Sequence, residues 1–125
     1  MRIERLEDVD SWKEARLLVS DTYRILANCR DFGFKSQMQR AAVSVMSNIA
    51  EGFDRGSNRE LVQYLIISRG SVSEVKSLAY AGLDIGHVDS KAFEAIKNRC
   101  IKLINRLNGF IRFLKENPRK GQAGR

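Results

Sequence analysis

The sequence predicts an all-α protein, folded as an antiparallel up-down-up-down four-helix bundle. Four segments carry apolar residues at three- and four-residue spacing, the period of a helix with one buried face. Short breaks containing Gly or Asp separate the segments, and connections of this length join antiparallel neighbours. The one proline, Pro118, follows the last segment, so the residues before it are free to be helical. A chain of 125 residues forms one domain, which we place at 1–117, followed by a flexible basic tail at 118–125.

The first two helices are predicted at about 9–30 and 36–52. Asp10 or Ser11 is expected to cap the first helix, whose apolar face carries Trp12, Ala15, Val19, Tyr23 and Leu26. The pattern breaks around Gly33. The second helix buries Met38, Ala42, Val45 and Ile49, and Gly52 is expected to end it as a C-cap, where a glycine adopts positive φ at little cost.

The third and fourth helices are longer. The third is predicted from Ser57 or Asn58, as caps, to about residue 83, with a buried face of Leu61, Leu65, Ser68, Val72, Val75 and Ala79. Asp89 or Ser90 is expected to cap the fourth helix, which ends before Pro118. Its stripe consists of Phe93, Ile96, Cys100, Leu103, Leu107, Ile111 and Leu114.

Two helices carry more apolar surface than one core needs. Leu18 and Ile25 lie beside the main stripe of the first helix, and Val62, Ile66 and Tyr80 do so on the third. A second apolar stripe on a helix is usually covered by another surface. We therefore predict a homo-oligomer whose contacts include these five residues; a different protein partner would explain the stripes as well.

A run of small and polar residues marks the end of the second helix and the middle of the third. It comprises Ser44, Asn48, Ile49, Ala50, Glu51, Gly52 and Arg55, followed by Gly70, Ser71 and Glu74. Small side chains let two helices approach closely. This run resembles the signature of a family of small bacterial four-helix-bundle proteins, named for open reading frames inside intervening sequences of 23S ribosomal RNA genes. The resemblance covers roughly residues 5–115.

The resemblance implies a cytosolic bundle that assembles as a ring-shaped homopentamer, with no established enzymatic activity and a link to nucleic acid. Proteins of this fold resemble the accessory variability protein of diversity-generating retroelements, so a reverse transcriptase is a possible further partner.

Composition bounds the location and the partners. The net charge is +7 and the sequence pI is about 9.8, a balance that favours acidic partners such as RNA or DNA. The chain shows neither a membrane span nor an apolar signal segment, so we expect a cytoplasmic protein. Cys29 and Cys100 lack neighbouring Cys or His at ligand spacing and are expected to be reduced thiols, with no metal and no cofactor.

The fourth helix supplies the candidate binding residues. Arg99, Lys102 and Arg106 recur at i, i+3 and i+7, on a side that the pattern places opposite the core stripe. Such a row can neutralise successive phosphates, and Phe113, further along the same line, can stack on a base. Arg112 and Lys115 add charge nearby. The sequence therefore predicts a non-catalytic module that binds RNA or DNA.

An enzymatic alternative rests on Asn48, Glu51, Arg55 and Glu74. Paired carboxylates on facing helices can bind metal ions or transfer protons, which would suit a metal-dependent nuclease using Glu51 and Glu74. However, the two helices hold no Glu-x-x-His motif, and the one histidine, His87, falls in a predicted loop. Polar groups near helix ends usually satisfy backbone groups, so the pattern favours a structural role.

Overall fold

The computed structural model describes residues 4–117, which contain four α-helices, one short 3-10 helix and no strand. The predicted all-α, four-helix bundle is confirmed. The predicted tail at 118–125 lies outside the described residues. The elements are η1 (Leu6–Asp8), α1 (Asp10–Ile25), α2 (Phe32–Asp54), α3 (Asn58–Ile85) and α4 (Ser90–Glu116).

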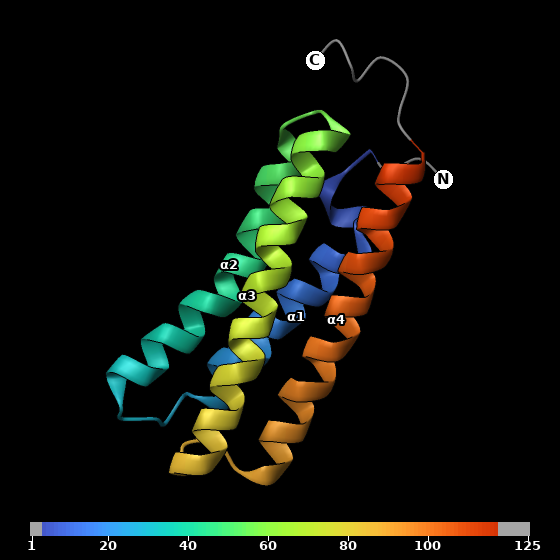
Figure 1. Ribbon diagram of the computed structural model, residues 1–125. Helices are drawn as coiled ribbons and strands as arrows, with labels where there is room; N and C mark the ends of the chain where they lie inside the picture. The colour runs from blue at the N-terminus through green and yellow to red at the C-terminus, as the bar shows by residue number, and fades with distance from the viewer. Residues whose placement is uncertain (1–3, 118–125) are drawn as a thin grey trace.

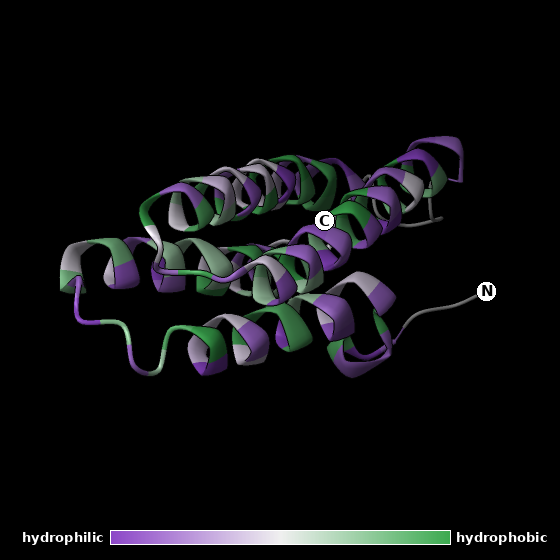
Figure 2. Ribbon diagram, turned by 90° about the horizontal axis from the view of Figure 1, so that it is seen from below, coloured by the Kyte–Doolittle hydropathy of each residue, from purple (hydrophilic) through white to green (hydrophobic). Residues whose placement is uncertain are grey.

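Each helix packs against the next one in the sequence, and α1 also packs against α4, so the four helices lie side by side around a common core (Figure 1). Hydrophobic residues recur on the inward sides of the helices when the bundle is seen from below (Figure 2). Among the residues that are completely buried are Val45, Ile49, Val72, Leu103 and Leu107, as the periodicity predicts. No helix within residues 4–117 combines the length and the apolarity that crossing a bilayer requires.

Helix ends follow their capping residues. Asp31 accepts a hydrogen bond from the Phe34 amide, so α2 begins at Phe32, four residues earlier than predicted. Ser57 and Asp89 cap α3 and α4 as expected. The prediction for α1 was wrong: Val9 occupies its N-cap without a side-chain hydrogen bond.

Gly52 has a different role from the predicted one. Helix α2 continues past it to Asp54, and in the connection from α2 to α3 it is Gly56 that has a positive φ, of 87°. A Cβ on Gly52 would lie 2.6 Å from the Cβ of Tyr64, so the glycine is needed because α2 and α3 approach closely there. The close contact, rather than a helix end, explains this part of the signature.

The buried face of α1 is rotated from the predicted one. Its buried residues are Ser11, Glu14, Ala15, Leu18 and Thr22. Thr22 fits the core because its hydroxyl donates to the Leu18 carbonyl at 2.7 Å. Tyr23, predicted to be inside, is exposed, and Trp12 is partly buried against the core.

Two of the residues assigned to second apolar stripes belong to the core of the single chain. Leu18 is completely buried and Val62 is 8% exposed, so the prediction that they lie on an additional outer stripe was wrong. The physical reason is that a helix with two neighbours buries a wider face than one stripe. Ile66 and Tyr80 are exposed, and Ile25 is partly buried.

Candidate nucleic-acid interface

The predicted cationic row on α4 faces α1 and is paired with acidic residues. Arg99 Nε donates to Asp21 Oδ2 at 2.7 Å, and its Nη1 lies 3.1 Å from Glu14 Oε1. Lys102 Nζ is 3.2 Å from Glu14 Oε2, and Arg106 Nη1 is 3.6 Å from Asp10 Oδ2. Because residue numbers rise along one helix as they fall along the other, the two helices run in opposite directions.

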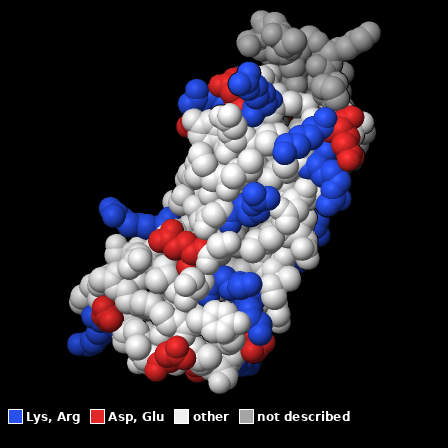
Figure 3. Space-filling view, viewed as in Figure 1, with Lys and Arg blue, Asp and Glu red and all other residues white. Residues whose placement is uncertain are grey.

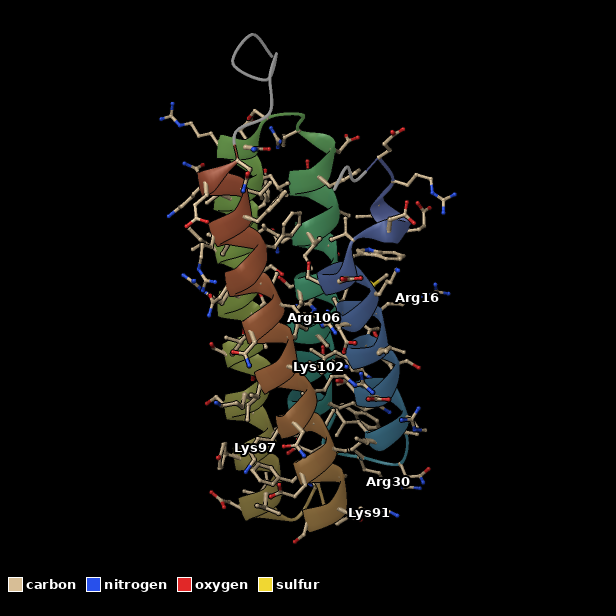
Figure 4. All side chains as sticks on the ribbon, turned by 90° about the vertical axis from the view of Figure 1, so that its right-hand side faces the viewer. Arg16, Arg30, Lys91, Lys97, Lys102 and Arg106 are labelled. Carbon is tan, nitrogen blue, oxygen red and sulfur yellow. The ribbon has the colours of Figure 1, made fainter. Side chains whose placement is uncertain are left out.

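This arrangement corrects the prediction that the row lies opposite the core. The row flanks the core stripe on the side of α1, and Figure 4 shows Lys102 and Arg106 between α4 and α1. The side chain of Arg99 is only 26% exposed, and that of Glu14 only 11%. Ion pairs as sheltered as these tie two helices together, so Arg99 has a structural role. Lys102 and Arg106 are more open to solvent, but carboxylates offset their charges.

A second group of basic residues lies at the end of α4, and its charges are not offset in this way. Arg59, Arg112, Phe113 and Lys115 form what we call the end patch. All four side chains are exposed, and none of the three cations has a carboxylate within ion-pairing distance among residues 4–117. Asn58 Nδ2 donates to the Leu114 carbonyl at 3.3 Å, which brings the start of α3, and thus Arg59, to this end of α4.

The end patch carries part of the predicted site. Arg112, Phe113 and Lys115 were predicted from the sequence; Arg59 was missed because only the fold brings the start of α3 beside the end of α4. Elsewhere, on the face that Figure 3 shows, Lys and Arg side chains are spread out rather than gathered in one block. The described termini of the bundle meet at the end of α4, and the sequence beyond it adds Arg119, Lys120 and Arg125.

A cavity of about 240 Å³ opens beside the end patch, between η1, the start of α1 and the end of α4. Its apolar wall is formed by Val9, Phe110 and Phe113. Its polar residues are Asp8, Asp10, Ser11 and Arg106. The sequence indicated Arg106 and Phe113 but not the other five, since their proximity depends on how α1 and η1 pack on α4.

The signature residues form a polar seam between α2 and α3. The hydroxyl groups of Ser44 and Ser71 are 3.0 Å apart, and Asn48 Nδ2 donates both to Ser44 Oγ at 3.0 Å and to the Ser44 carbonyl at 2.8 Å. Ser68 adds a hydrogen bond from its hydroxyl to the Val45 carbonyl at 2.7 Å. These bonds satisfy polar atoms inside a helix contact.

Arg55 secures the connection between the same two helices. It donates to the Tyr64 hydroxyl at 2.7 Å and lies 3.3 Å from Glu51 and 3.9 Å from Glu60. The hydrogen bonds of Asn48 and Arg55 fit the structural role that the sequence favoured for them.

The structure separates the two carboxylates of the nuclease hypothesis. Glu51 pairs with Arg55, whereas Glu74 lines a hollow beside Arg40 and Ala41 on the other half of α2. Ten residues of helix, about 15 Å, separate positions 41 and 51. Residues 4–117 contain no group of three or more His, Cys, Asp or Glu able to hold a metal ion.

Burial raises the pKa of the Cys100 thiol to about 12, which keeps it in the unreactive thiol form.

Comparison with known proteins places the chain in a family. The family model described as 23S rRNA-intervening sequence protein matches residues 7–109. None of the curated proteins compared with the chain matches it. A solved protein of unknown function, from the S23 ribosomal protein family of Bacteroides thetaiotaomicron VPI-5482, superposes with a TM-score of 0.75 at 18% identity, over 81% of this chain and 97% of that one. That likeness shows a shared fold, and the family match shows that this chain is a member of the 23S rRNA-intervening sequence protein family.

Proposed function

We propose that the protein is a non-enzymatic scaffold in the cytoplasm that binds RNA or DNA through the end patch. The observation that carries the proposal is the division of the basic residues of α4. Those that face α1 are paired with Asp10, Glu14 and Asp21, whereas Arg112 and Lys115 have no such partner within residues 4–117. Cations without an intramolecular partner are the ones available to phosphates.

The chemistry of the end patch suits a nucleic-acid strand. Three cations can each neutralise a phosphate and release its counterions. Phe113 is 41% exposed and offers a ring on which a base can stack. Glu116, in the same turn, offsets part of the charge, so one copy of the patch supplies only modest affinity.

We further propose that this up-down-up-down bundle is the subunit of a homo-oligomer, a pentamer as the family resemblance implies. The exposed side chains of Ile66, Ile67 and Tyr80 on α3 support an apolar contact with another copy. Several end patches in one assembly would act together on a long strand, since linked weak sites reinforce one another. Assembly thereby compensates for the small number of cations in each patch.

Binding measured over a range of salt concentrations tests the proposal. Fluorescein-labelled single-stranded RNA and DNA of equal length are titrated with the protein, and the dissociation constant is followed by anisotropy. If each subunit that contacts the strand neutralises three phosphates, the slope of log K against log salt is about −2 for each such subunit. Absence of binding to both strands at low salt would contradict the proposal.

A further inference from the structure

The cavity beside the end patch combines features that a phosphate site does not need. Two aromatic residues, Phe110 and Phe113, line it. Asp8, Asp10 and Arg106 also line the cavity, with Arg106 Nη1 3.6 Å from Asp10 Oδ2. The carboxylates disfavour an anion, so this cavity is not a second phosphate site. A flat, uncharged ring with hydrogen-bonding edges fits such a lining.

A buried hydroxyl in the wall has no hydrogen-bond partner among residues 4–117. Ser11 is 2% exposed, and its Oγ makes no hydrogen bond within the part of the chain that the structure describes. Buried polar atoms without a partner are rare in native proteins and mark places where a water molecule or a ligand completes the hydrogen bonding. The Ser11 hydroxyl can therefore bond a polar occupant of the cavity without giving up a bond to residues 4–117.

We infer that the cavity binds a single unstacked guanine base of the strand held by the end patch, an inference that rests on the proposed function. Guanine offers donors at N1 and N2 and acceptors at O6 and N7. A carboxylate can accept hydrogen bonds from N1 and N2, and an arginine commonly donates to O6 and N7. Asp8 or Asp10 and Arg106, which all line the cavity, supply these two kinds of group.

Size and position support this choice. A cavity of about 240 Å³ is smaller than the sites of drug-sized ligands, which span about 300–1,000 Å³. Phe113 belongs both to the cavity wall and to the end patch, so a strand whose phosphates lie along Arg112 and Lys115 passes the cavity mouth. Single-stranded nucleic acids are commonly read through bases that are splayed out and stacked on aromatic side chains.

The same lining disfavours adenine. Its N1 is a hydrogen-bond acceptor, whereas the carboxylates of the cavity need a donor at that position.

Labelled abasic oligonucleotides with one central base test the inference. Four strands carry guanine, adenine, thymine or no base, and each is titrated at the same salt concentration. We expect the guanine strand to bind about tenfold more tightly than the abasic strand, the size of one stacked and hydrogen-bonded base. The strands that carry adenine or thymine should gain less affinity over the abasic strand. Equal affinity for all four strands would overturn the inference but leave the proposed function intact.

Variants connect the preference to the cavity. Phe113→Ala and Ser11→Ala should each reduce the preference for guanine severalfold. Ser11→Ala should not destabilise the fold, because the hydroxyl makes no hydrogen bond to residues 4–117. Phe32→Ala is the matched control, since Phe32 is an exposed ring at the start of α2 that does not line the cavity. An unchanged preference in both cavity variants would overturn the inference.

Neutral guanosine provides a readout that does not depend on strand binding. NMR titration of the wild-type protein with guanosine should shift the ring resonances of Phe110 and Phe113, and leave those of Phe32 unchanged. If strands fail to bind but guanosine shifts these rings, the end-patch proposal is wrong and the cavity assignment holds. If guanosine causes no shift at millimolar concentration, the cavity assignment is wrong.

Discussion

The guanidinium of Arg99 on α4 is fixed on Asp21 of α1, with its Nε 2.7 Å from Asp21 Oδ2. The same group reaches Glu14, so one arginine holds two carboxylates of the neighbouring helix. On the side of α4 that faces α1, the positive charges that suggested a ligand site are therefore largely paired with carboxylates of the same chain. Arg112 and Lys115 at the end of α4 have no such partner within residues 4–117 and are open to a polyanion.

Removing Arg99 should destabilise the bundle. Arg99→Ala leaves Glu14 and Asp21, both largely buried, without their shared partner, and we expect a loss of about 1–3 kcal/mol in the free energy of unfolding. Urea denaturation measures the loss. Arg112→Ala on the same helix is the control and should change stability by less than about 0.5 kcal/mol, because its exposed side chain has no ion-pair partner within residues 4–117. Equal losses would show that the Arg99 contacts do not stabilise the fold.

The two glycines of the signature should respond in opposite ways to alanine. In Gly52→Ala the new Cβ would lie 2.6 Å from Tyr64 Cβ, so α2 and α3 must separate, at a cost of about 1–3 kcal/mol. In Gly70→Ala the new Cβ meets nothing within 4 Å, and the better helix propensity should stabilise the single bundle by about 0.5–1 kcal/mol. Thermal unfolding of both variants checks this. A stabilised Gly52→Ala would contradict the close approach of the helices.

Stability should depend on pH through Asp31 in the acid range. The hydrogen bond from His87 at 2.9 Å, followed by that from the Phe34 amide, lowers the pKa of Asp31 below its ordinary value of 3.8. A carboxyl whose pKa is lowered by folding stabilises the protein above its unfolded pKa, and this contribution is lost as the pH falls through the folded pKa.

Asp31→Asn isolates this contribution, since Asn still caps a helix. The melting temperature of the wild type should exceed that of Asp31→Asn at about pH 5, and the difference should shrink as the pH falls below 3.8. If the difference in melting temperature stayed constant as the pH falls below 3.8, protonation of Asp31 would not affect the stability of the fold.

Oligomeric state tests the proposed assembly. Light scattering after size exclusion should give a mass about five times that of the 14.2 kDa chain. Ile66→Glu should lower this mass, because it places a charge at an exposed apolar position within α3. Ile85→Glu, at the last residue of α3, also replaces an exposed isoleucine but should leave the mass unchanged. A monomer at micromolar concentration would contradict the assembly.

Sequence reasoning predicted the four helices and most of the core, because apolar spacing repeats over long segments and Ser57 and Asp89 mark two helix starts. It misplaced the face of α1, where Ser11, Glu14 and Thr22 occupy the buried side. Polar residues that form hydrogen bonds or ion pairs inside the bundle cannot be identified as core residues from the spacing of apolar residues.

The site was less predictable, because charge pairing is a property of two helices. A single helix shows that Arg99, Lys102 and Arg106 are in register, but not that Asp10, Glu14 and Asp21 face them from α1. Since Asp21 lies 78 residues from Arg99, no local spacing reveals the pair. For the same reason, only the fold could show that the start of α3 meets the end of α4, or that Ser11 and Phe110 line one cavity.

The most direct test of the central claim compares two triple charge reversals in one RNA-binding assay. The first is Arg59→Glu, Arg112→Glu and Lys115→Glu in the end patch. The second is Arg16→Glu, Arg30→Glu and Lys91→Glu, which changes the net charge equally at basic residues that also lack a carboxylate partner within residues 4–117 (Figure 4). Circular dichroism confirms that both variants remain helical.

The end-patch variant should lose binding at moderate salt, and its salt slope should be shallower by about 2 per bound subunit, whereas the control should keep its slope and most of its affinity. Equal losses in both variants would contradict it, because binding would then follow net charge and not the end of α4.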